Sequence, residues 1–337
     1  MIPHPSPSGL LAWLWICSLL APAAALGQPF LRSSPVARIT QTSYHGWTEA
    51  LILANGYAEA VVVPAIGRVM QFRRVGEVDG PFWENRALDG AHPDPHAKEW
   101  INFGGDKTWP APQADWNVQT GRAWPPPKAF DSMPASASID EKRGRITLTS
   151  AVDPHYGIRV IRSLTLAEGE VRLSIRTRYE KVEGDPVKTG VWIITQLRDP
   201  ELAVMPVPGR SIFPEGFNRQ SDQAPQGLLR LGNLLVMSRH RLASTKIGND
   251  ASALLWIGRR DMMLIEGPRR GGGEFPDQGS SAEIYTNPDP LAYVELELLG
   301  PLKTLKKGQS LEFTTRYTLL PRKRSNADEE ARAVFAR

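Results

Sequence analysis

The spacing of turn-forming residues is the feature that most restricts what this chain can fold into. Glycine and proline occur 29 times each in 337 residues, and short apolar runs recur between them. An amphipathic helical pattern occurs only near the C-terminus, where residues 326–335 predict a short helix. This pattern is typical of an all-β sandwich or barrel. We expect one large β domain over residues 35–322, with a linker at 28–34 and a tail at 323–337.

Several strands can be placed from local patterns. The Asn-Gly pair at 55–56 is the strongest short hairpin signal in the chain. Residues 171–179 alternate apolar and polar side chains, so one face should be buried and the other exposed. Residues 190–197 are more continuously apolar, as expected near the centre of a sheet. Residues 86–133 show no strand pattern, and we predict one long irregular insertion over a face of a sheet.

The first 27 residues have the pattern of a signal peptide. Residues 10–26 form an apolar run that is short for a membrane span and is followed by small residues. The single cysteine, Cys17, lies inside it, so the mature chain would have no disulfide and no cysteine-ligated zinc. We therefore expect a periplasmic or secreted bacterial protein without stable membrane insertion after cleavage. A retained N-terminal anchor is the alternative.

The charge of the chain argues against a nucleic-acid partner. The formal net charge is only +4, and the basic residues are spread along the sequence rather than gathered in one arm. No nucleic-acid motif is present. No phosphate-binding loop is found either, and we expect no cofactor.

Residues 100–116 combine three tryptophans with two adjacent glycines and two prolines. Glycine permits a sharp turn or a close approach, and proline stiffens the chain. The polar side chains of this segment are Asn102, Asp106, Lys107 and Gln113. Indole packs on the C–H faces of sugars while such polar groups bind hydroxyls, so Trp109 and its neighbours predict a sugar site. The alternative is a small core in which the tryptophans hold a long loop in place.

Two parts of the chain resemble a known superfamily. Residues 55–68 (NGYAEAVVVPAIGR) resemble the opening strands of the aldose 1-epimerase, or galactose mutarotase-like, superfamily, and residues 281–310 resemble its closing strands. Residues 35–322 are also similar to an uncharacterised family of exported bacterial domains, through the motif GGDKxWPAPQ at 104–113. The resemblance implies an all-β, galactose mutarotase-like β-supersandwich. Its concave sheet would carry a sugar site beneath a long loop insertion.

The resemblance also suggests catalytic residues. Mutarotation needs a general base and a general acid. In the superfamily these are a glutamate near the closing strands, matched here by Glu283, and a histidine on a central strand. That strand carries Gln196 and no histidine, and glutamine cannot act as an acid. Asp106 or Lys107 could replace the acid if burial shifted its pKa. Alternatively, Glu283 is a surface carboxylate paired with an arginine.

Two further groups have more than one interpretation. Tyr293, Glu295 and Glu297 alternate with apolar residues, so this polar face could line a sugar cleft or could meet only water. His92 and His96 have metal-ligand chemistry, but the intervening prolines prevent helical spacing. We interpret them as part of a solvated loop and expect no metal.

The sequence therefore predicts an exported carbohydrate-binding or carbohydrate-processing protein, possessing epimerase-like or lyase-like chemistry if it is an enzyme. The expected catalytic residues are Glu283, Asp106 and Lys107. The expected sugar contacts are Asn102, Trp109, Gln113, Gln196, Tyr293 and Glu295. One alternative is a non-catalytic carbohydrate-binding protein that has lost the catalytic acid, and another is a structural cell-envelope protein.

Overall fold

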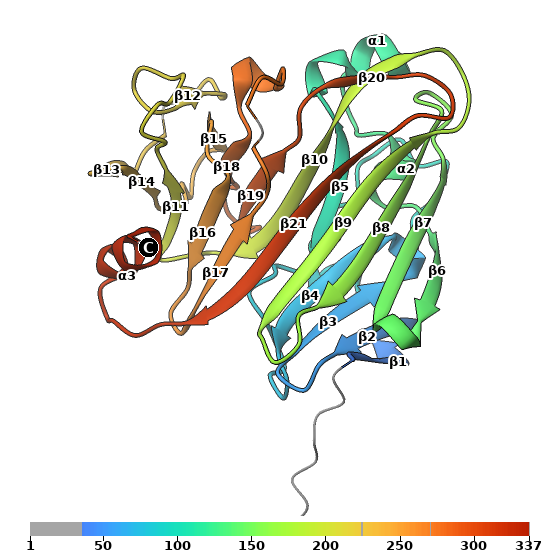
Figure 1. Ribbon diagram of the computed structural model, residues 1–337, viewed down its shortest axis with the longest axis horizontal. Helices are drawn as coiled ribbons and strands as arrows, with labels where there is room; N and C mark the ends of the chain where they lie inside the picture. Colours follow the sequence, from blue (N-terminus) through green and yellow to red (C-terminus); the bar gives the residue numbers. More distant parts are fainter. Residues whose placement is uncertain (1–35, 224, 270, 337) are drawn as a thin grey trace, which may run out of the picture. The chain divides into compact units, whose positions relative to one another are not determined.

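The computed structural model describes residues 36–223, 225–269 and 271–336, which form two large antiparallel β-sheets (Figure 1). The predicted signal peptide and the whole of the predicted linker lie outside the described residues. No helix among the described residues is long and apolar enough to cross a membrane.

The first sheet has eleven strands among the described residues. In spatial order these are β1 (Arg38–Tyr44), β2 (Trp47–Ala54), β3 (Ala58–Val63), β4 (Arg68–Arg74), β5 (Asp106–Ala111), β10 (Val187–Arg198), β19 (Tyr293–Leu299), β18 (Ala282–Thr286), β15 (Thr245–Asn249) and β12 (Asn218–Arg219), with β20 (Lys303–Leu305) paired to β10. The longest of them, β10, lies in the middle.

The second sheet has ten strands within the same described ranges. Their order is β13 (Leu228–Leu231), β14 (Leu234–Met237), β11 (Leu202–Pro206), β16 (Ala253–Ile257), β17 (Asp261–Glu266), β21 (Ser310–Pro321), β9 (Arg172–Lys181), β8 (Ile158–Leu166), β7 (Arg145–Val152) and β6 (Ala135–Asp140). The helices described are α1 (Trp116–Thr120), α2 (Lys128–Asp131) and α3 (Ala327–Phe335).

The structure confirms the all-β prediction and several of the expected elements. The Asn-Gly turn at 55–56 joins β2 to β3. In β9 the alternate residues Leu173, Ile175 and Tyr179 are fully buried. The predicted C-terminal helix is α3, whose first turn is capped by the Asn326 side chain. It packs on an apolar cluster of the second sheet that includes residues of β11, β14 and β16.

The interpretation of residues 86–133 as irregular throughout is wrong. This range contains β5, which pairs with β10 over six residues in the middle of the first sheet. The sequence of this strand, DKTWPA, lacks the usual alternation of apolar and polar residues. Proline is also unusual away from a sheet edge. Part of the segment does lie over a sheet face, because Trp47 Nε1 of β2 donates to the carbonyl of Ala91 at 2.8 Å.

The two glycines before β5 allow the close approach that was predicted. Gly104 and Gly105 have φ angles of 91° and 70°, in the left-handed region. A Cβ on Gly104 would lie 2.3 Å from the carbonyl oxygen of Trp83, and one on Gly105 would lie 2.5 Å from that of Val69. Larger residues would therefore push β5 away from its neighbours.

The inner face of the first sheet meets the second sheet. Asp106 of β5 forms an ion pair with Arg162 of β8 and accepts a hydrogen bond from the Tyr317 hydroxyl of β21 at 2.6 Å. Thr108 contacts the Tyr179 hydroxyl of β9, also at 2.6 Å. Because side chains alternate along a strand, Lys107 and Trp109 point to the opposite side, which we call the outer face of the first sheet.

We predict that Asp106→Ala destabilises the fold strongly. The substitution leaves Arg162 buried without its carboxylate, which typically costs about 3–5 kcal/mol. Chemical denaturation would measure the loss. The control is Glu312→Ala. Glu312 lies on β21, is about half exposed and pairs with Arg176 of β9, so its removal should lower the free energy of unfolding by less than about 1 kcal/mol. Equal losses in the two variants would contradict the structural role of Asp106.

Candidate functional site

A cavity of about 290 Å³ opens on the outer face of the first sheet. Tryptophans form one part of its wall, and side chains of β15, β18 and β19 form another. The lining residues are Trp100, Trp109, Gln113, Trp124, Trp192, Lys246, Tyr285, Asn287, Tyr293, Glu295 and Glu297. Such a combination of apolar surface with a few converging polar groups is typical of a small-molecule site.

The tryptophan wall is built around Trp109. Its ring centroid lies 5.3–6.0 Å from those of four other tryptophans, in edge-to-face arrangements. Its Nε1 donates to Asp131 of α2 at 2.8 Å, and Asp131 also pairs with Arg68 at 2.9 Å. Trp109 is only 4% exposed, whereas Trp124 is 46% exposed. Trp109 therefore supports the wall, and Trp124 offers the more accessible surface.

Lys107 lies directly beneath this wall. Its Nζ is 5.0 Å from the ring centroid of Trp109 and 3.4 Å from Glu295 Oε1. The side chain has no exposed surface. Burial lowers the pKa of Lys107, and the attraction of Glu295 opposes that shift. Gln196 Nε2 donates to the same oxygen of Glu295 at 2.8 Å, so this carboxylate is fixed from two sides.

A second lysine lies between two glutamates. Lys246 Nζ of β15 is 2.7 Å from Glu283 Oε2 and 2.9 Å from Glu297 Oε2. It also lies 4.5 Å from the ring centroid of Trp192, whose Nε1 donates to Glu297 at 2.6 Å. Burial alone would lower the pKa of Lys246, but the two carboxylates outweigh it and raise that pKa. Burial, with Glu283 and Glu295 nearby, raises the pKa of Glu297 well above its usual value.

The structure gathers some of the predicted site residues and separates others. Trp109, Gln113, Tyr293 and Glu295 line the cavity, while Lys107 and Gln196 contact Glu295. Their role in binding a sugar stays a prediction. Glu283 is on the same face but is fully buried and touches Lys246.

Two of the predicted residues, Asp106 and Asn102, do not line the cavity. The expectation that Asp106 shares a site with Lys107 and Glu283 is wrong, because Asp106 points to the inner face and pairs with Arg162. Neighbouring residues of a strand cannot both face one cavity. Asn102 is mostly buried, and its Oδ1 accepts from the Gly104 amide at 3.2 Å, which fixes the turn before β5.

Sequence reasoning did not identify Lys246 or Trp124 as site residues. Lys246 is one polar residue in a short strand, and only the pairing of β15 with β18 brings it to Glu283. No local signal marks that contact. Trp124 lies between a glycine-containing turn and three prolines, and the unusual number of tryptophans nearby could have indicated it. His92 and His96 are exposed, and the described residues hold no group of three or more histidine, cysteine or acidic residues placed to hold a metal ion.

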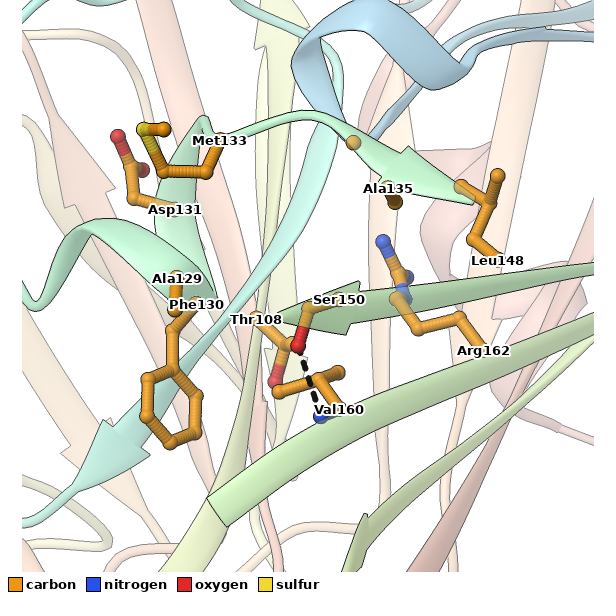
Figure 2. A pocket seen from close by; sticks show the side chains of 11 residues that line it. Thr108, Ala129, Phe130, Asp131, Met133, Ala135, Leu148, Ser150, Val160 and Arg162 are labelled. Carbon is orange, nitrogen blue, oxygen red and sulfur yellow. Dashed lines mark hydrogen bonds between the residues drawn. The ribbon is translucent and has the colours of Figure 1, made fainter. Parts of the chain in front are cut away.

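A second, much smaller cavity lies between α2 and the strands β7 and β8 (Figure 2). Its volume of about 20 Å³ is enough for one water molecule but not for a sugar. In Figure 2, Phe130 and Asp131 of α2 lie on one side, and Ser150 and Arg162 lie on the other. The cavity on the outer face is the candidate ligand site because it combines tryptophans with converging carboxylates.

Solved structures share this fold at low sequence identity. A candidate aldose 1-epimerase from Escherichia coli K12 is 12% identical, covers 85% of this chain and 100% of its own, and has a TM-score of 0.55. A galactose mutarotase-like protein from Lactobacillus casei is 11% identical, with coverages of 80% and 99% and a TM-score of 0.54. A candidate mutarotase from Salmonella typhimurium is 10% identical, with coverages of 86% and 95% and a TM-score of 0.54.

No protein-family model and no curated protein matches the chain. The structural likeness nevertheless confirms the expected galactose mutarotase-like fold. At these identities the likeness concerns the fold alone, so the chemistry of the site has to be argued from the residues of this chain.

The structure predicts a pH-dependent effect of Asp277→Asn. Burial and the nearby Glu283 raise the pKa of Asp277 from 3.8 to about 6. The folded state thus holds the proton more tightly than the unfolded state, and this contribution to stability is lost as the pH rises from about 4 through 6. Asparagine cannot ionise, so the variant should be more stable than wild type at pH 7 by roughly 1–3 kcal/mol.

Denaturation at pH 4 and pH 7 would test this prediction. Asp277 has a positive φ of 50°, which asparagine also tolerates well, but that benefit does not depend on pH. A stability difference of the same size at both pH values would show that the carboxylate is not perturbed.

Proposed function

We propose that this chain is an exported carbohydrate-binding protein whose ligand occupies the cavity on the outer face of the first sheet. The observation that carries the proposal is the composition of this cavity. Trp124 offers an accessible indole, and Glu295 and Glu297 offer acceptors for hydroxyl groups on the same lining. The volume of about 290 Å³ lies at the lower end for ligand pockets and suits a ligand about the size of a monosaccharide.

The fold supports the same proposal. The chain shares a galactose mutarotase-like fold with proteins named for sugar chemistry. The charged groups that line its cavity lie on β15 and β19 and contact neighbouring strands, so these side chains are held in place before a ligand arrives. Such preorganisation lowers the entropy cost of binding. Localisation in the periplasm or outside the cell remains part of the proposal, since it rests on the signal-peptide pattern of residues 1–27.

Binding without epimerase catalysis is favoured by two observations. Gln196 stands on the central strand where the resemblance expects an acid, and its amide donates to Glu295. Glu283, which matches the expected base, does not line the cavity and is paired with Lys246. A base needs to come within hydrogen-bond reach of the proton that it removes. If the protein is an enzyme, Glu297 is better placed than Glu283 for acid–base chemistry.

We predict that Trp124→Ala weakens carbohydrate binding by roughly 1–3 kcal/mol, the range for a well-placed aromatic contact. Trp124 is nearly half exposed, so Trp124→Ala should destabilise the fold far less than Trp109→Ala does. For the buried Trp109 we expect a loss of about 3–5 kcal/mol in the free energy of unfolding. Calorimetry with a panel of free monosaccharides, after a glycan-array screen, would measure binding. Val78→Ala, 80% exposed, is the control and should bind as wild type does. If no carbohydrate binds the wild type, the proposed function fails.

We also predict little aldose 1-epimerase activity on free galactose or glucose. Lack of a positioned general acid typically costs about 10²–10⁴ in rate. Polarimetry on freshly dissolved α-anomers would measure the rate against the uncatalysed reaction. Rapid mutarotation that is lost in Glu297→Gln but retained in Glu312→Gln would instead show that the cavity carries out the reaction.

A further inference from the structure

The carboxylates that line the cavity keep oxygen atoms free for a ligand. The hydrogen bonds that Lys107 and Gln196 donate to Glu295 both end on Oε1. Those that Trp192 and Lys246 donate to Glu297 both end on Oε2. No hydrogen bond from the described residues reaches the other oxygen of either carboxylate. Each glutamate therefore has an acceptor to offer at the cavity.

The charges around the cavity do not balance. Three carboxylates, those of Glu283, Glu295 and Glu297, surround two ammonium groups, those of Lys107 and Lys246. With all five groups ionised, the difference is one negative charge (three minus two). Arg68 and Asp131 nearby pair with each other and add none. The excess carboxylate is costly in a buried setting, and the raised pKa of Glu297 is one expression of that cost.

The protein already binds ammonium groups on these indole faces. Lys107 Nζ lies 5.0 Å from the Trp109 ring centroid and Lys246 Nζ lies 4.5 Å from that of Trp192, each beside a carboxylate. A cation near an indole face is attracted by the ring quadrupole, and more strongly where water is excluded. The wall also includes Trp124, whose ring no lysine or arginine of the described residues covers. A third ammonium group would thus find both a carboxylate and an indole.

We propose that the ligand of this cavity is an amino sugar with a free, protonated amine, held between the Glu295 and Glu297 carboxylates and the tryptophan wall. This inference rests on the proposed carbohydrate function and specifies its substrate class. The ammonium group supplies the missing positive charge, and the hydroxyl groups use the remaining acceptors. A uronic acid or a sugar phosphate would instead add negative charge next to two carboxylates.

Calorimetry with matched ligands tests the proposal on the wild-type protein. The ligands are glucosamine, N-acetylglucosamine, glucose and glucuronate, together with the galactose series of the same compounds. We expect the free amino sugar of at least one series to bind about tenfold or more tightly than its neutral parent, as charge-assisted hydrogen bonds are stronger than neutral ones. The acetylated sugar should lose this advantage because acetylation removes the charge.

A second readout is proton release. The ligand ammonium favours the ionised form of Glu297. At a pH where Glu297 is protonated in the free protein, binding of the amino sugar should therefore expel a proton from it, and binding of the neutral sugar should not. The binding enthalpy of the amino sugar would then change with the ionisation enthalpy of the buffer. Besides Lys246, Glu283 and Glu295, the charged groups around Glu297 include Lys107, and Asp277 lies beyond Glu283.

A pair of variants locates the effect. Glu295→Gln keeps the shape of the side chain and should abolish the preference for the amine, measured as the ratio of the affinities of this one variant for the amino sugar and for its neutral parent. Glu312→Gln, on the second sheet, should retain the preference. If Glu295→Gln fails to fold because Lys107 loses its partner, the ligand comparison on wild type still decides the question.

The outcomes separate this inference from the proposed function. Binding of neutral sugars at least as tight as that of their amino derivatives overturns the inference and leaves the carbohydrate function intact, as does a preference for glucuronate. Ethanolamine, which carries the amine without a sugar ring, is a further control. If it binds as tightly as glucosamine does, the sugar part of the inference is overturned. If none of the sugars binds, the proposed function itself fails.

Discussion

Two charges on neighbouring residues of β5 are buried on opposite faces of the first sheet, and much of the structure depends on them. Asp106 holds Arg162 and joins the first sheet to the second. Lys107 pairs with Glu295 and so joins β5 to β19 across β10, the strand between them. A shift of β5 by one residue would bring the lysine against Arg162 and leave Glu295 without its cation. Such a shift reverses every side chain of a strand, so these charges specify the register more strictly than apolar packing could.

The same arrangement explains the shape of the candidate site. Lys107 and Lys246 support the tryptophans from below while their carboxylate partners are held by Gln196 and Trp192. Each polar group in the floor of the cavity is therefore oriented by a neighbour from another strand. Rigid elements and supporting contacts of this kind keep a binding site in its productive geometry. The cavity does not need a ligand to organise it.

The sequence was informative wherever a local pattern controls the structure. The Asn-Gly turn, the alternation of β9, the apolar run of β10 and the capped C-terminal helix were all predictable. The glycines at 104–105 were understood as points of close approach, but the strand that follows them was missed because Lys107, Trp109 and Pro110 do not resemble a central strand. Its identity comes from pairing with β10, which lies about 80 residues away.

The candidate site was predictable only in part for the same reason. The tryptophans and the polar face of β19 could be identified one segment at a time. Lys246 could not, since its importance comes from Glu283 and Glu297 on two other strands. The inward direction of Asp106 also depends on the second sheet. A motif such as GGDK shows that its residues matter but does not show to which side each one points.

The distance along the chain between contacting residues has a consequence for how the protein acquires its structure. Strands β1 to β4 are successive neighbours and need only short loops to pair. By contrast, Lys107 and Glu295 are 188 residues apart, and Asp106 and Tyr317 are 211 apart. Closing such long loops costs entropy before the contacts can compensate for it, which slows folding. During synthesis Asp106 can pair with Arg162 after 56 further residues, whereas Lys107 lacks its carboxylate partner until almost the whole chain has emerged. The cavity on the outer face is therefore among the last parts of the molecule to form.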